Sequence, residues 1–151
     1  MFARLMKDQQ LTLATSESCT GGMLAQLFKA IRGSSKWFEC GFVTYSDASK
    51  TRLLGVQAKV LDEHGAVSKK TAEQMALGAL RNSAADISVS ITGIAGPDGG
   101  CVNKPVGTVY IAIARLKQDP EVTHYLFKGD RDSIRKQATL AAISQLVEQI
   151  S

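Results

Sequence analysis

Short β-type runs alternate with stretches of helical spacing along the chain, and this alternation limits the possible folds more than any other feature of the sequence. Apolar and β-branched runs predict strands at residues 11–15, 38–45, 87–92, 106–116 and 122–127. Apolar residues spaced three and four apart predict helices at residues 20–32, 47–54, 58–64, 68–82 and 133–150. This order predicts an α/β sandwich with a mixed sheet, in which the last two strands form an antiparallel hairpin.

The chain has the length and composition of one globular domain. It has 151 residues, of which 44% are hydrophobic and 21% are charged, and it contains no repeat, low-complexity tract or linker. A chain of this length buries roughly two thirds of its unfolded surface when it folds. We therefore expect a single domain over residues 1–151.

The formal net charge of +4 is spread evenly along the sequence. Ten Lys and Arg and seven Asp and Glu precede residue 76, and eight and seven follow it. No basic stripe with interleaved aromatic residues is present, so we expect no nucleic-acid partner. This does not exclude a small anionic ligand, whose binding requires no net charge.

The cysteines and histidines do not have the spacing of a metal site. Cys19, Cys40 and Cys101 lie far apart without CxxC spacing, and His64 and His124 are isolated. Neither a zinc site nor a disulfide framework is predicted. No stretch is long enough to span a membrane, and the first ten residues lack the features of a signal peptide. We expect a cytoplasmic protein that makes no membrane contact.

Three polar segments, two of which contain glycines, interrupt the apolar pattern. They are TSESCTGG at residues 15–22, TYSDASK at 44–50 and ITGIAGPDGG at 91–100. The first and third follow strands, and the second runs from a strand into a helix. Ligands of open α/β sheets bind at the carboxyl ends of strands, so we expect the three segments to form one cleft.

The TSESCTGG segment has two interpretations. In the structural one, Ser18 or Thr20 caps the following helix, and Gly21 and Gly22 let that helix pack close to the sheet. In the functional one, free N–H groups at the helix amino terminus bind a phosphate or a reaction oxyanion. The spacing fits neither a Walker loop nor a GxGxxG fingerprint.

A nucleophile in this segment would need a base. Ser18 and Cys19 are both candidates, and the thiol has the higher intrinsic nucleophilicity. No histidine is well placed, which leaves Lys50, five residues after Tyr45. Burial would lower the pKa of Lys50 and let it deprotonate Ser18, with Tyr45 relaying the proton. The alternatives are a solvated Lys50, or a charged one that holds a phosphate.

The ITGIAGPDGG segment and the start of the last helix could hold an anion. Four glycines and a proline in ten residues favour a tight loop whose N–H groups face inward, with Asp98 shaping a turn. Arg131 and Arg135 lie four residues apart. Each is either exposed or able to bind a ligand phosphate through two hydrogen bonds.

Seven stretches of the sequence resemble the carboxy-terminal domain of the CinA competence/damage-inducible protein family, which includes stand-alone nicotinamide-nucleotide amidases. The stretches are ESCTGGMLA, GSSKWFECGFVTYSDASK, LGV, HGAVS, ITGIAGPDGG, KPVGTVYIA and GDRDSIRKQAT. They occur in family order and extend from Leu11 to the last helix. The resemblance also implies a short leading helix at residues 2–7.

The resemblance implies a three-layer α/β/α sandwich with a mixed, mostly parallel five-stranded sheet. It implies hydrolysis of nicotinamide mononucleotide to nicotinic acid mononucleotide and ammonia, without metal or cofactor, by a homodimer. The implied catalytic residues are Ser18, Lys50 and Tyr45. The oxyanion would be held by N–H groups of Cys19 and Thr20, or by those of a turn at Thr92 and Gly93. The residues expected to bind substrate are Cys19, Thr20, Gly21, Gly22, Thr44, Thr92, Gly93, Gly96 and Arg135.

Two other functions fit the same segments. One is a nucleotide-binding module without catalysis, which would use the same loops to hold a phosphate. The other is a partner-binding protein in DNA uptake or repair, a role suggested by the family name and disfavoured by the even distribution of charge.

Overall fold

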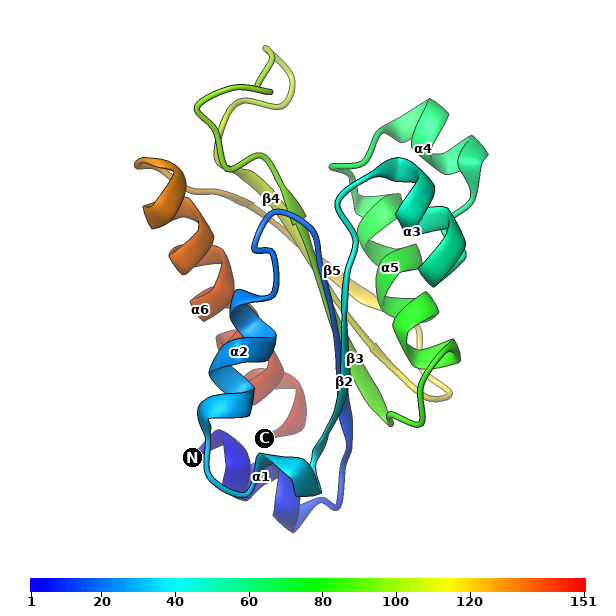
Figure 1. Cartoon of the computed structure of the whole chain (residues 1–151), viewed down its shortest axis with the longest axis vertical. Coiled ribbons are helices and arrows are strands. Elements are labelled where there is room, and N and C mark those ends of the chain that lie inside the picture. Colours follow the sequence, from blue (N-terminus) through cyan, green and yellow to red (C-terminus); the bar gives the residue numbers. More distant parts are fainter.

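The computed structural model describes all 151 residues and has three layers, with a sheet between two sets of helices (Figure 1). The strands are β1 Leu13–Glu17, β2 Phe38–Val43, β3 Ile87–Gly93, β4 Thr108–Arg115 and β5 Glu121–Leu126. The helices are α1 Phe2–Asp8, α2 Met23–Ala30, α3 Asp47–Leu54, α4 Ala58–His64, α5 Lys69–Arg81 and α6 Arg131–Ile150, with a 3-10 turn, η1, at Ser34–Lys36. Helices α1, α2 and α6 lie on one side of the sheet, and α3, α4 and α5 lie on the other (Figure 1).

The sheet is mixed, in the order β2-β1-β3-β4-β5. β1 pairs in parallel with both β2 and β3, whereas β4 is antiparallel to β3 and to β5. The predicted α/β class and the predicted terminal hairpin are therefore confirmed. Because β1, β2 and β3 run in the same direction, the segments that follow them leave the sheet at one edge.

The helix after β1 begins later than predicted. Its expected start was residue 20, but α2 begins at Met23. Gly21 and Gly22 have φ angles of +60° and +102°, which lie outside the right-handed helical region. The N-cap residue is Gly22, so the prediction that Ser18 or Thr20 caps this helix is wrong. The residues between β1 and α2 form a turn instead.

The other element boundaries lie within two residues of the predicted ones. The short helices at 47–54 and 58–64 have the predicted bounds, and the leading helix α1 extends one residue further than expected. α6 begins two residues earlier than predicted, because Asp130 caps it by accepting a hydrogen bond from the N–H of Ser133 at 2.8 Å.

Large side chains fill the space between the sheet and the α1, α2 and α6 layer. Phe2, Phe28 and Trp37 are buried there, and their ring centroids lie 5.0 to 5.4 Å apart. This aromatic cluster ties α1 to α2 and to the start of β2.

Small side chains let α5 approach the other side of the sheet closely. The β3 hydroxyls of Ser88 and Ser90 donate to the α5 carbonyls of Ala76 and Ala72 at 2.6 and 2.7 Å. These hydrogen bonds satisfy polar groups that the close packing removes from water. On the other side of α5, Gly78 lies directly against the Leu54 carbonyl at the end of α3.

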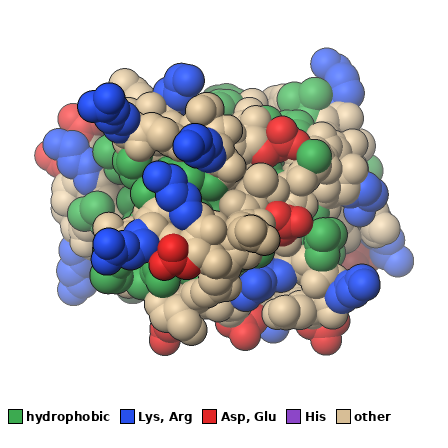
Figure 2. Space-filling model, turned by 90° about the horizontal axis from the view of Figure 1, so that it is seen from below, with side chains coloured by type: hydrophobic (Ala, Val, Ile, Leu, Met, Phe, Trp, Pro, Cys, Tyr) green, Lys and Arg blue, Asp and Glu red, His purple; other side chains and the backbone are tan.

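The face of the molecule opposite the β3–β4 loop carries no continuous basic stripe (Figure 2). At the end of the molecule opposite the β3–β4 loop, Lys and Arg side chains spread from one side to the other with acidic side chains among them (Figure 2). No helix combines the length and the apolar character needed to cross a lipid bilayer.

Replacing Gly78 by Ala is expected to destabilise the fold by about 1–3 kcal/mol, because a Cβ would overlap the Leu54 carbonyl and force α3 and α5 apart. Urea unfolding measures this loss. The matched control is Lys70→Ala on the exposed side of the same helix, which should change the free energy of unfolding little. An unchanged or increased stability of Gly78→Ala would contradict the close contact between these two helices.

Candidate active site

The side chains of Ser18 and Lys50 meet at the edge of the sheet where β1 and β2 end. Ser18 directly follows β1, and Lys50 lies in α3, which follows β2. The parallel pairing places Glu17 opposite Val43, so both strands end at the same level. The Nζ atom of Lys50 lies 3.0 Å from the Oγ atom of Ser18.

Lys50 is buried without a carboxylate partner. Its side chain has 0% exposure, and no acidic oxygen lies within ion-pair distance of its Nζ atom. Nζ also lies 3.1 Å from the backbone oxygens of Thr44 and Tyr45. Burial lowers the pKa of Lys50 below its usual value, and Asp47 and Cys19 act in the opposite direction. Compared with water, the site therefore shifts Lys50 toward its neutral form.

Lys50 has three polar neighbours, all of which can accept its hydrogens. A neutral amine has two N–H donors and one lone pair, and backbone carbonyls can only accept. The carbonyls of Thr44 and Tyr45 therefore take the two N–H groups. The Nζ atom of Lys50 also donates to the Oγ atom of Ser18 at 3.0 Å. In the neutral amine, the lone pair would take this third direction and could accept the proton of the Ser18 hydroxyl. This is the arrangement of a general base and its nucleophile.

The neighbouring thiol is poorly suited to be the nucleophile. Burial raises the pKa of Cys19 to about 11. Four smaller effects act on the pKa of this thiol. The charge of Glu17 raises the pKa further, whereas a hydrogen bond from the backbone N–H of Cys19 and the charges of Arg135 and Arg131 lower it. At neutral pH this site holds a thiol, and the thiolate is the reactive form of cysteine.

The turn after Ser18 leaves two backbone N–H groups free. The N–H of Ser18 donates to the carbonyl of Ile91 at 3.0 Å, and that of Gly21 donates to the carbonyl of Ser18 at 3.1 Å. The N–H groups of Cys19 and Thr20 donate to no protein oxygen. They directly follow the candidate nucleophile, where an oxyanion hole would need donors.

The alternative oxyanion site has a different structure from the one predicted. Thr92 and Gly93 were expected to form a turn, but they are the last two residues of β3 and pair with Tyr110 and Val109 of β4. The hydroxyl of Thr92 donates to the carbonyl of Ala66 at 2.7 Å. The backbone of these residues belongs to the sheet, so the prediction of a turn is wrong.

The amino terminus of α2 is not open to an external anion. The buried carboxylate of Glu17 accepts hydrogen bonds from the N–H groups of Leu24 and Ala25, at 2.9 and 3.0 Å, and from the Thr20 hydroxyl at 2.7 Å. The N–H groups of Leu24 and Ala25 are therefore not available to a ligand phosphate or an oxyanion. The chain supplies its own anion there.

A cavity of about 230 Å³ opens in front of the Ser18–Lys50 pair. Seven of the residues predicted to act in the site line it: Ser18, Cys19, Tyr45, Lys50, Thr92, Gly93 and Gly96. The other five predicted residues do not: Thr20, Gly21, Gly22, Thr44 and Arg135. The sequence analysis did not single out Ala66 and Val67, which also line the cavity, although they belong to the HGAVS stretch that resembles the family.

The two arginines of the last helix differ in position. Arg135 donates from Nε and Nη2 to the carbonyls of Cys19 and Thr20, at 3.0 and 3.1 Å. Arg131, one turn earlier, lines the cavity and donates to the carbonyl of Gly96 at 2.8 Å. Of the two, Arg131 is the one that faces the cavity.

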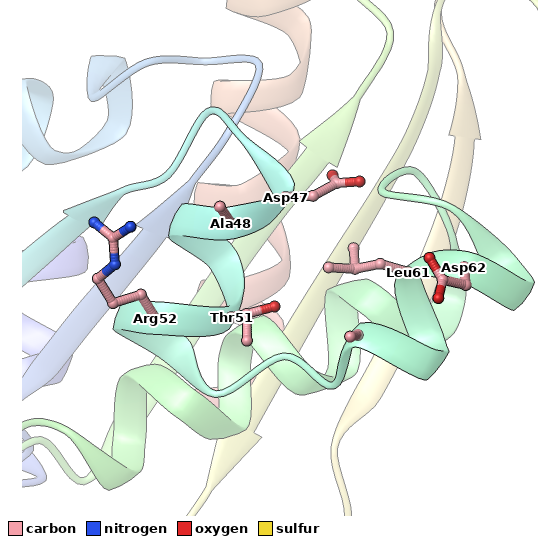
Figure 3. A pocket seen from close by; sticks show the side chains of 7 residues that line it. Asp47, Ala48, Thr51, Arg52, Leu61 and Asp62 are labelled. Atoms are coloured by element: carbon pink, nitrogen blue, oxygen red, sulfur yellow. The ribbon is translucent and has the colours of Figure 1, made fainter.

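A larger hollow, of about 430 Å³, lies between α3 and α4 (Figure 3). Asp47 and Leu61 extend toward the space between the helices, and Arg52 points away from α4 (Figure 3). The residues that line this hollow include neither Ser18 nor Lys50. No group of three or more His, Cys, Asp or Glu side chains lies close enough together to hold a metal ion anywhere in the chain.

The fold and the sequence place the chain in a known family. The model of the CinA C-terminal domain matches residues 1–150, and the chain belongs to this family. The resemblance inferred from the seven stretches is confirmed.

Several relatives are similar over nearly the whole chain. The nicotinamide-nucleotide amidohydrolase PncC of Escherichia coli is 49% identical over 144 residues, which cover 95% of this chain and 87% of that protein. A CinA-like protein of Citrifermentans bemidjiense is 48% identical over 145 residues, which cover 96% of this chain and 35% of that protein. The crystal structure of a competence/damage-inducible protein from Agrobacterium tumefaciens matches with a TM-score of 0.93 and 39% identity, and covers 97% of this chain and 92% of that one.

The buried amine predicts a specific dependence of stability on pH. Because the pKa of Lys50 is lowered by folding, the unfolded chain binds more protons between the folded-state pKa and about 10.4. The free energy of unfolding should therefore rise with pH in this window, relative to that of Lys50→Met. Urea unfolding of both proteins from neutral pH to about pH 10 measures the difference.

The control for this experiment is Lys69→Met, which removes an exposed lysine at the start of α5. Its difference from the wild type should not change with pH. Parallel pH profiles for Lys50→Met and the wild type would contradict a lowered pKa for Lys50.

Proposed function

We propose that the protein is an amidohydrolase that converts nicotinamide mononucleotide to nicotinic acid mononucleotide and ammonia, with Ser18 as nucleophile and Lys50 as base. The observation that carries the proposal is the 3.0 Å contact between the Ser18 hydroxyl and a buried amine that lacks a carboxylate partner. The proposed substrate is supported by the 49% identity to an amidohydrolase of nicotinamide nucleotides.

In the first step, the Oγ atom of Ser18 attacks the carboxamide carbon while its proton moves to the Nζ atom of Lys50. The negative charge that develops on the carboxamide oxygen is stabilised by the free N–H group of Cys19, which lines the cavity. One such donor contributes about 3–4 kcal/mol to the transition state. The pyridinium ring of the substrate is cationic, so it withdraws electrons from the carboxamide and favours attack.

In the second step, the C–N bond breaks and the nitrogen leaves as ammonia. The proton that Lys50 accepted returns to this nitrogen through the hydroxyl of Tyr45, a cavity-lining residue that is 80% exposed. Water then cleaves the acyl-enzyme ester, with Lys50 as the base for the second time. The product acid leaves, and the Ser18–Lys50 pair returns to its starting state.

The substrate phosphate is assigned to Arg131. Both arginines of α6 were candidates, but two nitrogens of Arg135 already bind the turn after Ser18. Arg131 faces the cavity, together with Gly96 and Gly99, whose N–H groups donate to no protein oxygen. A guanidinium beside free backbone donors suits a phosphate. The role of Arg135 as a direct substrate contact and the homodimer both stay predictions.

Replacing Ser18 by Ala or Lys50 by Met is expected to lower ammonia release from nicotinamide mononucleotide by a factor of about 10⁴ or more, because each removes one member of the nucleophile–base pair. Cys19→Ala is the matched control and should keep most of the activity. If Cys19→Ala releases no ammonia while Ser18→Ala remains active, the nucleophile is the thiol of Cys19 and not the Ser18 hydroxyl. Binding of the mononucleotide by calorimetry without turnover would instead indicate a binding module.

Arg131→Ala is expected to raise KM about tenfold or more with kcat nearly unchanged, because a charged hydrogen bond to a phosphate contributes equally to ground and transition states. Steady-state kinetics over a range of substrate concentrations measures this. Arg52→Ala removes an arginine at the hollow between α3 and α4 and serves as the control. Equal KM values for Arg131→Ala and the wild type would contradict the phosphate assignment.

A further inference from the structure

The residue before Ser18 carries a buried charge that the proposed reaction does not consume. The side chain of Glu17 has 0% exposure, and no basic side chain lies within ion-pair distance of its carboxylate. Burying a carboxylate is costly unless hydrogen bonds replace its water. Here the hydroxyl of Thr20 and the N–H groups of Leu24 and Ala25 replace it.

The backbone of Glu17 is fixed in the sheet while its side chain reaches α2. Its carbonyl accepts the N–H of Thr44 at 2.9 Å, and the next N–H, from Ser18, donates to the carbonyl of Ile91 at 3.0 Å. The residue is therefore held between β2 and β3. Its side chain spans the turn at residues 18–22 and binds the first turn of the helix that follows. Both ends of the turn are joined through this one residue.

Arg135 holds the same turn through other groups. Its guanidinium binds the carbonyls of Cys19 and Thr20. In a trans peptide the N–H points opposite to the preceding carbonyl. The N–H of Thr20 therefore points away from Arg135, and its direction is set once the Cys19 carbonyl is bound. The side chain of Thr20 is held in turn by Glu17 at 2.7 Å.

We propose that Glu17 is a positioning residue of the amidase reaction. Its carboxylate locks the turn at residues 18–22 between the sheet and α2, and thereby sets the directions of the Ser18 hydroxyl and of the free N–H groups of Cys19 and Thr20. This inference rests on the proposed function, in which the Ser18 hydroxyl attacks the carboxamide and the N–H of Cys19 holds the oxyanion. Glu17 itself does not touch the substrate, since it does not line the cavity.

The carboxylate also has an effect on the adjacent thiol. The negative charge of Glu17 is among the groups that raise the pKa of Cys19. Removal of this charge should make Cys19 react faster with an alkylating reagent at a fixed pH. This readout does not depend on turnover, and it reports on the turn directly.

The test is Glu17→Gln, which keeps the shape of the side chain. One carboxylate oxygen becomes an NH₂ group, which can donate a hydrogen bond but not accept one. This group must face either the N–H of Ala25 or the N–H of Leu24 and the hydroxyl of Thr20, so at least one hydrogen bond of the wild type is lost. We expect kcat for nicotinamide mononucleotide to fall about ten- to hundredfold, because small displacements of reacting groups have effects of this size. KM should stay within about threefold, because the Arg131 side of the cavity is unchanged.

The matched control is Asp86→Asn at the opposite end of β1. Asp86 also uses a carboxylate oxygen to hold a backbone N–H, that of Thr12 at 2.9 Å, and the hydroxyl of the same residue at 3.0 Å. This variant loses a comparable interaction far along the strand from Ser18. Asp86→Asn should keep the wild-type kcat, even if it lowers the free energy of unfolding by as much as Glu17→Gln does.

The outcomes separate the inference from the proposed function. A wild-type protein that releases no ammonia overturns both. An active wild type with an unchanged kcat in Glu17→Gln overturns this inference alone, as does an equal loss of kcat in Asp86→Asn. If Glu17→Gln does not fold, Thr20→Val removes only the 2.7 Å hydrogen bond and should lower kcat about three- to tenfold. An unchanged kcat in that variant overturns the inference.

Discussion

A lysine buried without a carboxylate partner is the constraint around which the rest of the site is built. The side chain of Lys50 is removed from water, and its amine has only two carbonyls and one hydroxyl as polar neighbours. Burial favours the uncharged form, and the two carbonyls consume its donors. The third neighbour is the Ser18 hydroxyl. In the proposed reaction this amine acts as the base, without a histidine.

The fold supplies these surroundings from segments that lie far apart in the sequence. Parallel pairing of β1 with β2 brings the turn after β1 beside α3, so that Ser18 meets Lys50. The close approach of α5 to β3 and to the end of α3 supports the helix that carries the lysine. On the other side of the sheet, Arg135 of α6 binds the carbonyls of the turn. Each layer of the sandwich therefore contributes to the position of one reacting group.

Much of this could be predicted from the sequence, because strand order and residue type carry it. The polar segments at the ends of two strands left the pairing of Ser18 with Lys50 as one of several alternatives, and the family resemblance favoured it. The start of α2 did not follow, because the apolar spacing begins only at Leu24 and does not mark the first helical residue. The positive φ angles of Gly21 and Gly22 appear only in the structure. The role of Glu17 was missed for a related reason. A glutamate in ESCTGG gives no local sign of which donors it will meet. The choice between Arg131 and Arg135 depends on where the helix begins and on its rotation.

The central claim concerns the charge state of one amine, and side-chain NMR tests it directly. Lysine Nζ and Cε resonances would be followed through a pH titration of the folded protein, with the Lys50 signal assigned by its loss in Lys50→Met. The account predicts that Lys50 titrates below the usual value of a lysine side chain, about 10.4. A Lys50 signal that titrates together with the exposed lysines would contradict it.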